Sequence, residues 1–270
     1  MNQLPQHKKV QIINLLVEGM SLRAISRLTG CSINTVTKIL VHAGKACEEF
    51  HNKTIIKIKA KRVECDEIWS FVYCKKKNVR HGMDEIVGDV WTWIAIDADT
   101  RLVISYIAGR RDNVTAIKFM HDLYDRLNNR IQLTTDGFKA YRELVEQCFG
   151  FAIDFAQLEK IYDSREHYLG ANKIIRAGAP DMSKVSTSYV ERQNLTMRMH
   201  MRRFTRFTNA FSKKIQNHLY AIALHFVYYN FCKIHQTLRV TPAMEAGLTK
   251  DIMEISDIVA LMENDISKKP

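Results

Sequence analysis

Apolar positions in the first fifty residues recur with the period of an α-helix. Residues 8–19 carry them three and four positions apart, which places them on one side of a helix. Two shorter patterns of the same kind cover residues 22–30 and 33–44, and each follows a serine that can cap its first turn. Three short helices joined by tight turns predict a helix-turn-helix domain over residues 1–48.

The third of these helices would be the recognition helix, which enters the major groove of DNA. Its polar side chains available for base contacts are Asn34, Thr35, Thr37 and Lys38. The same pattern also fits a three-helix scaffold that does not bind DNA. Residues 49–62 are basic and lack a clear period, which indicates a linker or an edge strand.

From residue 63 the pattern changes to short apolar runs rich in β-branched and aromatic residues, which are typical of strands. Helical patterns separate the later runs, and Asn113 is the expected cap of the first. The expected elements are strands at 63–74, 90–98 and 102–109, a helix at 113–129, a strand at 131–137, a helix at 138–150 and a strand at 151–158. Residues 160–186 contain Gly and Pro without a clear period, so a loop-rich insertion is expected there.

This order of strands and helices matches the ribonuclease H-like fold. We therefore expect an α/β (α+β) domain over residues 63–240, in which helices flank a mixed sheet. Residues 241–270 form an acidic tail with an amphipathic helical pattern. The tail would either dock on the domain or mediate self-association.

Charge is distributed unevenly along the chain. The net charge is +11, and residues 1–62 and 187–240 each carry about +8, whereas the other segments are slightly acidic. Two cationic segments indicate a polyanionic partner, for which nucleic acid fits better than a membrane; a solvated basic surface is the alternative. No apolar run approaches the ~18 residues that cross a bilayer, and no secretory segment follows the N-terminus. A cytoplasmic location without a membrane partner is expected.

Cysteine and histidine do not form metal-binding motifs in this sequence. The six cysteines are scattered and none is paired as C-x-x-C, so neither a disulfide framework nor a zinc site is expected. His218 and His225 lie in an apolar helical run and are expected in the core. His235 has a phosphate contact as an alternative role.

Three acids occupy positions that a ribonuclease H-like sheet can bring together. Asp66 lies within the first strand, Asp136 ends the fourth, and Glu191 begins a basic helical segment. Carboxylates suit Mg²⁺ (or Mn²⁺), and two such ions can activate the attacking oxygen and stabilise the leaving oxygen at a phosphodiester. The simpler interpretations are a salt bridge or an outward-facing position for Asp66, a turn for Asp136 and a helix cap for Glu191.

Seven motifs, in order, resemble DDE transposases of the insertion-sequence-one family over about residues 63–247. They are "DEIWSFV", "WTWIAID", "GRRD", "QLTTDGFKAY", "TSYVERQNLTMRM", "RRFTRFTNAFSKK" and "YYNFCKIHQTLRVTPA". The resemblance implies a ribonuclease H-like core that cuts transposon ends and joins them to target DNA. Some members of the family carry a cysteine-rich zinc element, whose C-x-x-C pattern this chain lacks.

By the same resemblance, Asp66, Asp136 and Glu191 are the catalytic metal ligands, for Mg²⁺ or Mn²⁺. The cations around Glu191 would then hold double-stranded DNA phosphates near the metal centre. The expected DNA-binding residues of this segment are Arg192, Asn194, Arg198, Arg202, Arg203, Arg206, Lys213 and Lys214. Arg198 and Arg202 would share a helical face, which Arg206 joins if the helix persists.

The expected function is that of an insertion-sequence transposase that binds element ends and catalyses strand cleavage and strand transfer. A homo-oligomer on DNA is expected because transposition pairs two ends. One alternative is a ribonuclease H-like nuclease without strand transfer. The other is a catalytically inert helix-turn-helix regulator.

Overall fold

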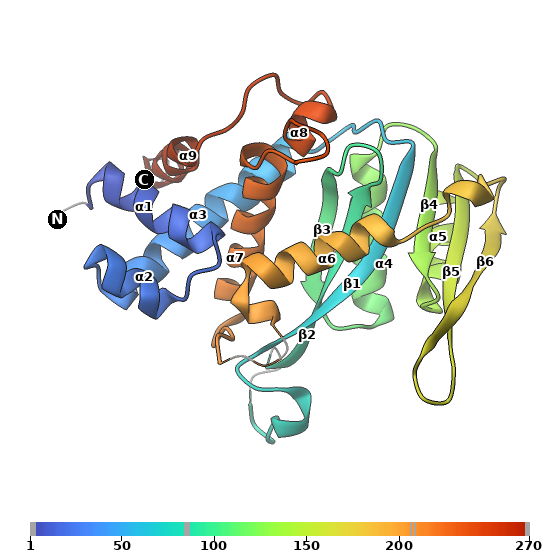
Figure 1. Ribbon diagram of the computed structural model, residues 1–270, viewed down its shortest axis with the longest axis horizontal. Helices are drawn as coiled ribbons and strands as arrows, with labels where there is room; N and C mark the ends of the chain where they lie inside the picture. The colour runs from blue at the N-terminus through green and yellow to red at the C-terminus, as the bar shows by residue number, and fades with distance from the viewer. Residues whose placement is uncertain (1–3, 84–86, 206, 208, 268–270) are drawn as a thin grey trace. The chain divides into compact units, whose positions relative to one another are not determined.

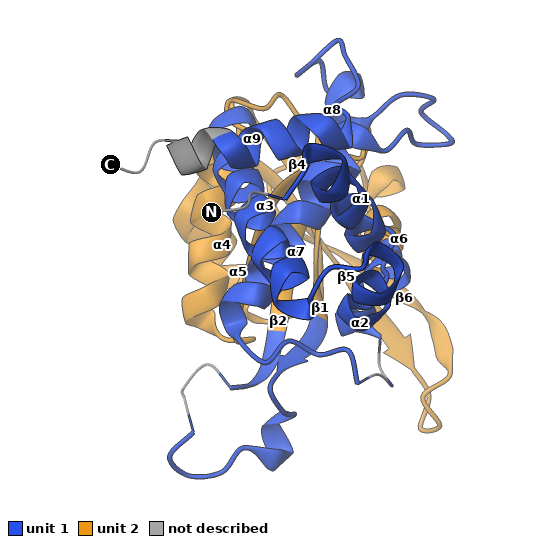
Figure 2. Ribbon diagram, turned by 90° about the vertical axis from the view of Figure 1, so that its left-hand side faces the viewer, with its two compact units in different colours: residues 1–54, 69–90, 195–270 blue, residues 55–68, 91–194 orange. Residues whose placement is uncertain are grey.

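The computed structural model describes residues 4–83, 87–205, 207 and 209–267, with side chains described up to residue 263. The chain divides into two compact units, which Figure 2 colours separately. We call them the helical unit and the sheet unit. The helical unit comprises residues 1–54, 69–90 and 195–270, and the sheet unit comprises residues 55–68 and 91–194.

Six strands form one sheet, ordered β3-β2-β1-β4-β5-β6 (Figure 1). They are β1 (Arg62–Val72), β2 (Gly88–Asp97), β3 (Val103–Gly109), β4 (Ile131–Asp136), β5 (Ile153–Tyr162) and β6 (Tyr168–Ala177). Strand β4 is parallel to both β1 and β5, whereas β2 with β3 and β5 with β6 form antiparallel pairs.

Hydrogen bonds near both ends of β1 show that it runs antiparallel to β2. The Ala98 N–H donates to the Arg62 carbonyl at 2.9 Å, and the Ser70 hydroxyl donates to the Val90 carbonyl at 3.0 Å. Three antiparallel strands followed by two parallel ones give the ribonuclease H-like order. The expected fold class, a mixed sheet flanked by helices, is therefore confirmed.

Helices cover both faces of the sheet at β1, where neighbouring side chains point to opposite faces. Glu64 accepts hydrogen bonds from the first turn of α6 (Ser188–His200), while Glu67 accepts one from Tyr141 on α5 (Ala140–Phe149). Most side chains of β1 are buried against one face or the other, including those of Glu64 and Glu67. The core on the α5 face includes Trp93, Phe119 and Tyr141, three of the largest fully buried side chains.

Helix α4 (Asn113–Arg126) starts where the sequence predicts, but its cap is a different residue. The side chain of Asp112 accepts a hydrogen bond from the Thr115 N–H at 2.9 Å. Asp112 has the extended backbone of a capping residue, whereas Asn113 is already helical. The assignment of the cap to Asn113 is wrong by one position.

Strands β5 and β6 form a hairpin within the residues expected to be a loop-rich insertion, so that expectation is wrong. Strand β5 continues to Tyr162, and β6 pairs with it antiparallel from Tyr168 to Ala177. Most side chains of β6 are exposed or half-buried. A strand without a buried face has no apolar alternation, which removes the signal that sequence analysis uses. A short 3-10 turn, η2 (Met182–Lys184), follows.

The helical unit contains the three predicted N-terminal helices with their predicted caps. Ser21 accepts a hydrogen bond from Ala24 N–H at 3.2 Å, and Ser32 accepts one from Thr35 N–H at 3.1 Å. The described helices and turns of this unit, besides the second half of α6, are α1 (Gln6–Val17), α2 (Leu22–Thr29), α3 (Ile33–Thr54), η1 (Lys76–Asn78), η3 (Arg202–Phe204), α7 (Ile215–Val227), η4 (Tyr228–Cys232), α8 (Pro242–Glu245) and α9 (Ile255–Ser267).

Helix α3 continues ten residues past Gly44, where the sequence pattern ends. A Cβ at Gly44 would lie 2.3 Å from both the Cβ and the carbonyl oxygen of Tyr220 on α7. Gly44 therefore permits a close approach of two helices and does not terminate α3. Residues 49–54, the first part of the expected basic linker, belong to this helix.

The acidic tail docks within the helical unit, where α9 packs against α3 and α1. Lys9 Nζ and Glu263 Oε1 form an ion pair at 2.7 Å across this contact. His218 and His225 are buried, as predicted, and burial lowers the pKa of each to about 3. All six cysteines are free. In the part of the chain described, no helix is both long and apolar enough to traverse a bilayer.

Candidate active site

Asp66 and Asp136 lie beside each other because β1 and β4 are parallel and in register. Cys65 pairs with Thr135, and each acid is the next residue on its strand. Side chains at matching positions of parallel neighbours point to the same face. Both acids line a cleft of about 730 Å³ in the sheet unit. The structure thus brings together two of the three acids named from the sequence.

Glu67 is a third member of this acidic group, and the sequence analysis missed it. Carboxylate oxygens of Asp66, Glu67 and Asp136 all lie within 4.8 Å of one another. Strand alternation predicts that neighbours point apart, but the Asp66 Oδ1 accepts the Glu67 N–H at 2.8 Å. The available signal was the adjacent acid pair, Asp66 and Glu67, inside a predicted strand.

Arg111 bridges two of the three acids. Its Nε donates to Glu67 Oε2 at 3.0 Å and its Nη2 to Asp136 Oδ2 at 3.4 Å. The guanidinium also lies over the rings of Trp91 and Phe138, at 5.0 and 4.4 Å from their centroids. These contacts fix its position and place a positive charge on the acidic group. The "GRRD" motif contains Arg111, but the sequence did not show which acids it would contact.

Burial and the neighbouring acids raise the pKa of Asp66 and of Glu67. Burial is the main cause of a pKa of about 6 for Asp66, and the charge of Asp136 adds to it. Burial, followed by Asp136, raises the pKa of Glu67 to about 7, although Tyr141 and Arg111 act in the opposite direction. Negative charge at this point of the sheet is therefore only partly compensated by the protein.

Glu191 lies in the first turn of α6 and lines the same cleft as Asp66 and Asp136. Its Oε1 accepts hydrogen bonds from Lys160 Nζ at 2.7 Å and from the Thr187 hydroxyl at 2.5 Å. Glu191 is not part of the group whose oxygens lie within 4.8 Å of one another. The Thr187 contact suits a helix start and the position in the cleft suits a metal ligand, so the role of Glu191 stays a prediction.

Two polar residues on α6 and β1 connect the helix to the acidic group. The Asn194 Nδ2 donates to Asp66 Oδ2 at 2.8 Å, and Asn194 is only 5% exposed. Asn194, expected to contact DNA, therefore positions Asp66. On β1, Glu64 accepts the backbone N–H groups of Tyr189 and Val190 at 2.8 and 3.1 Å. Burial raises the pKa of Glu64 to about 7, and Glu64 fixes the turn that carries Glu191.

The basic residues predicted to bind DNA are distributed over both units. Arg192, Arg202, Lys213 and Lys214 are exposed, and Arg198 is half-buried. Arg206 lies outside the described residues. Helix α6 ends at His200 and Met201 is extended, so the predicted helical face shared by Arg198 and Arg202 does not form.

Arg203 is engaged inside the helical unit. Its Nη1 donates to the Asn217 carbonyl at 2.7 Å and to Ser212 Oγ at 3.0 Å, and burial lowers its pKa to about 10. These contacts leave less of the guanidinium for a phosphate.

The predicted recognition residues lie in the first two turns of α3. Asn34 and Lys38 are exposed, and Thr35 and Thr37 are half-buried. The Thr37 hydroxyl donates to the Ile33 carbonyl at 2.8 Å, and Thr35 lies 3.0 Å from the capping Ser32 hydroxyl. Asn34 and Lys38 are therefore the more available of the four.

The acidic group fits a hard divalent cation such as Mg²⁺ or Mn²⁺. Such ions prefer carboxylate oxygens, and three carboxylates here lie within 4.8 Å of one another. The raised pKa values of Asp66 and Glu67 show uncompensated negative charge, which a cation would relieve.

No family model and no curated protein matches the sequence. Solved structures with a similar chain trace include an intasome of simian T-cell lymphotropic virus in complex with the PP2A regulatory subunit B56 gamma, at TM-score 0.44 and 13% identity over 88% of this chain and 74% of that chain. Others are a piggyBac transposase synaptic complex with hairpin DNA, at TM-score 0.49 and 7% identity over 98% and 73%, and a Mos1 transposase paired-end complex with the left transposon end, at TM-score 0.25 and 12% identity. The Mos1 match covers 55% of this chain and 57% of the Mos1 chain. All three TM-scores lie below 0.5.

Proposed function

We propose that this protein is a DDE transposase of the insertion-sequence-one family, which cleaves double-stranded DNA at element ends and joins them to target DNA. The observation that carries the proposal is the pairing of Asp66 with Asp136 at matching positions of β1 and β4. Both belong to motifs that resemble this family, and the motif Glu191 lines the same cleft.

In this proposal Asp66, Asp136 and Glu191 hold the divalent cations. Bound Mg²⁺ or Mn²⁺ supplies Lewis-acid stabilisation of the oxygens at a phosphodiester. Glu64 holds the first turn of α6 and Asn194 orients Asp66, which keeps two of the ligands in place. Lys160 is the present partner of Glu191, so that ion pair must open for Glu191 to become a ligand.

Positive side chains around the acids suit a DNA backbone. Lys139, Arg142 and Lys160 line the cleft together with the acids, and each can neutralise a phosphate without choosing a sequence. Asn34 and Lys38 on α3 would read bases in the element ends. A homo-oligomer on DNA is part of the proposal because two ends must be held for a joint insertion.

Strand cleavage and strand transfer by purified full-length protein test the assignment. The DNA substrates carry the inverted repeats that the proposal expects on either side of the gene, with a plasmid as target and Mg²⁺ present. We expect Asp66→Asn and Asp136→Asn to lower both rates by about 10²–10³-fold or more, since each removes a proposed ligand of the cation that stabilises charge at the reacting phosphate, and Glu191→Gln to do the same. Glu146→Gln removes an exposed acid of α5 and should leave both rates unchanged.

The remaining outcomes discriminate between functions. Insertion of two ends into one plasmid at a fixed spacing would support a transposase that acts as an oligomer. Cleavage without joining of a pre-cut end would indicate a nuclease. DNA binding without cleavage in any divalent metal, with the three variants equal to wild type, would indicate a regulator.

A further inference from the structure

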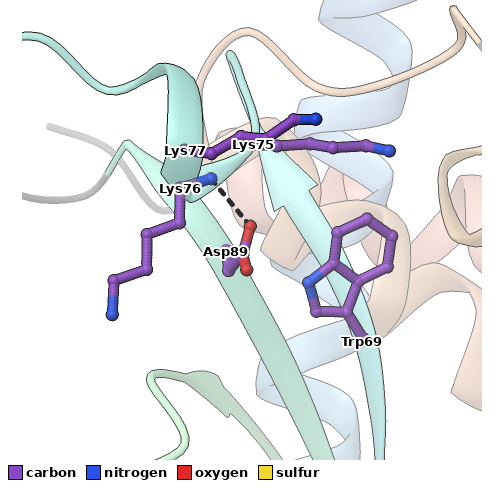
Figure 3. Close-up of a pocket in the computed structure, with 5 residues that line it drawn as sticks. All are labelled: Trp69, Lys75, Lys76, Lys77 and Asp89. Atoms are coloured by element: carbon purple, nitrogen blue, oxygen red, sulfur yellow. Dashed lines mark hydrogen bonds between the residues drawn. The ribbon is translucent and has the colours of Figure 1, made fainter.

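A second hollow, of about 460 Å³, lies where β1 leads into the β1–β2 connection. Figure 3 shows the residues that line it: Trp69, Lys75, Lys76, Lys77 and Asp89. All five belong to the helical unit, and none lines the acidic cleft. The hollow combines a tryptophan with three lysines, and the proposed catalytic group does not use it.

The connection that carries the lysines is held by specific contacts. Asp89 Oδ1 accepts the Lys76 N–H at 2.9 Å, a bond drawn in Figure 3, and the Lys75 carbonyl accepts the Asn78 N–H at 2.8 Å. Val79 packs against Gly88, where a Cβ would meet the Val79 Cγ2 at 3.3 Å. The 3-10 turn η1 therefore presents its lysines from a fixed backbone.

Two of the three lysine side chains extend on the side of the tryptophan ring. Figure 3 shows Lys75 and Lys77 extending in the same direction on the Trp69 side, while Lys76 extends away. Lys75 Nζ lies 5.6 Å from the centroid of the Trp69 ring. A cation at this distance interacts with the ring face, so that face is within reach of a ligand.

The basic segment around residues 213–214 adds positive charge beside the end of β1. The Tyr73 N–H donates to the Ser212 carbonyl at 2.8 Å, which places residue 212 beside the end of β1. Lys213 and Lys214 follow directly and are exposed. Asp84 and Glu85 follow η1 in the sequence, outside the described residues. The charge around Trp69 is thus mainly positive among the described residues.

An aromatic face combined with lysines is the chemistry that binds unpaired nucleic acid. Bases in a duplex are already stacked, so only an unpaired base can lie on the ring. Base–aromatic stacking is stronger than an exposed cation–π contact. A base can therefore replace Lys75 over Trp69, and the released ammonium can bind a neighbouring phosphate.

We propose that this hollow binds an unpaired DNA strand, with one base stacked on Trp69 and adjacent phosphates on Lys75 and Lys77. The inference rests on the proposed function, because cleaved or frayed transposon ends are the source of such strands. It adds a DNA contact in the helical unit to the acidic cleft of the sheet unit.

Binding of the full-length chain to two DNA duplexes, with EDTA present to prevent cleavage, tests this proposal. The duplexes are identical except that one carries a short unpaired 3′ end. Fluorescence anisotropy gives the affinities, and tryptophan emission reports stacking on Trp69. We expect the unpaired end to bind about tenfold tighter and to quench emission more strongly than the blunt end.

Three variants separate stacking from charge and from folding. Trp69→Leu should abolish both the preference and the extra quenching, whereas Trp69→Phe should keep most of the preference and lose the quenching. Lys75→Gln combined with Lys77→Gln should weaken binding of the unpaired end more than Lys118→Gln, an exposed lysine on α4. Circular dichroism confirms that each variant is folded.

Each other result would overturn the proposal. Equal binding of both duplexes, or extra quenching that persists in Trp69→Phe, would exclude stacking on Trp69 while leaving the transposase assignment intact. Failure of the wild-type chain to bind either duplex would contradict both this proposal and the transposase assignment. Quenching by a free mononucleotide without any preference for the unpaired strand would indicate a nucleotide site in its place.

Discussion

At the scale of single residues, Asp66 shows that burial can outweigh favourable hydrogen bonds. Its carboxylate accepts bonds from the Glu67 N–H and the Asn194 amide, both at 2.8 Å. Its pKa is nevertheless raised to about 6, because it is buried and faces Asp136. At neutral pH the acid is mostly ionised next to another acid. This raises the free energy of the folded chain, and a bound cation would lower it.

A pH-dependent stability difference between wild type and Asp66→Asn follows from this. An acid whose pKa is higher in the folded than in the unfolded chain destabilises the fold above the folded pKa. That cost disappears as pH falls below the unfolded value near 4. In EDTA at pH 8 we therefore expect Asp66→Asn to be more stable than wild type by roughly 1–3 kcal/mol. The advantage should shrink steadily toward pH 4.

Urea denaturation at pH 5 and pH 8 measures this difference directly. Subtraction of the two proteins cancels the opposing contribution of the buried histidines, which are shared. Glu146→Gln is the control and should show no pH-dependent difference. Adding Mg²⁺ at pH 8 should stabilise wild type and not Asp66→Asn. A difference that stays constant with pH would show that the raised pKa is not the cause.

At the scale of elements, Gly44 explains why the length of α3 could not be read from the sequence. A glycine near the end of an apolar period resembles a helix stop. Here it lies inside the helix because Tyr220 of α7 approaches to within 2.3 Å of where a Cβ would be. A glycine can end a helix or allow a neighbouring helix to approach closely. Which of the two applies at Gly44 depends on the position of α7.

Gly44→Ala should destabilise the protein although alanine favours helix by about 1 kcal/mol. The added methyl group would meet the backbone and Cβ of Tyr220, so α3 and α7 must move apart. We expect a loss of about 1–3 kcal/mol in the free energy of unfolding, measured by thermal or urea denaturation. His42→Ala, at an exposed position of α3, should change little. An unchanged or higher stability of Gly44→Ala would mean that the two helices are not in close contact.

Part of the fold and part of the candidate site could be predicted from the sequence. Buried strands and capped helices gave clear patterns, and β1, β4 and α5 were placed correctly. Strand β6 was missed because its side chains are mostly exposed or half-buried. Glu67 and Arg111 were missed because their role depends on which residues the fold brings near them. Asp66 and Asp136 could be named from their motifs, but their register is visible only in the sheet.

At the scale of the whole molecule, the net charge of +11 predicts that DNA affinity falls as salt concentration rises. Each phosphate neutralised by a lysine adds about 0.9 to the slope of log affinity against log salt concentration. We expect Lys213→Gln combined with Lys214→Gln to reduce the slope by about 2, measured by anisotropy with one DNA duplex. Lys118→Gln combined with Lys250→Gln removes the same charge elsewhere. An equal reduction in both pairs would mean that only net charge matters.

Arg111 has a consequence for how a metal ion would enter the acidic group. The guanidinium already occupies oxygens of Glu67 and Asp136 and is held by two aromatic rings. An incoming divalent ion would therefore compete with a resident cation and would not simply fill an open anionic site. The measured affinity for the ion then includes the free energy of displacing the Arg111 guanidinium. A substitution that loosens Arg111 from its rings would therefore tighten metal binding without altering any of the ligands.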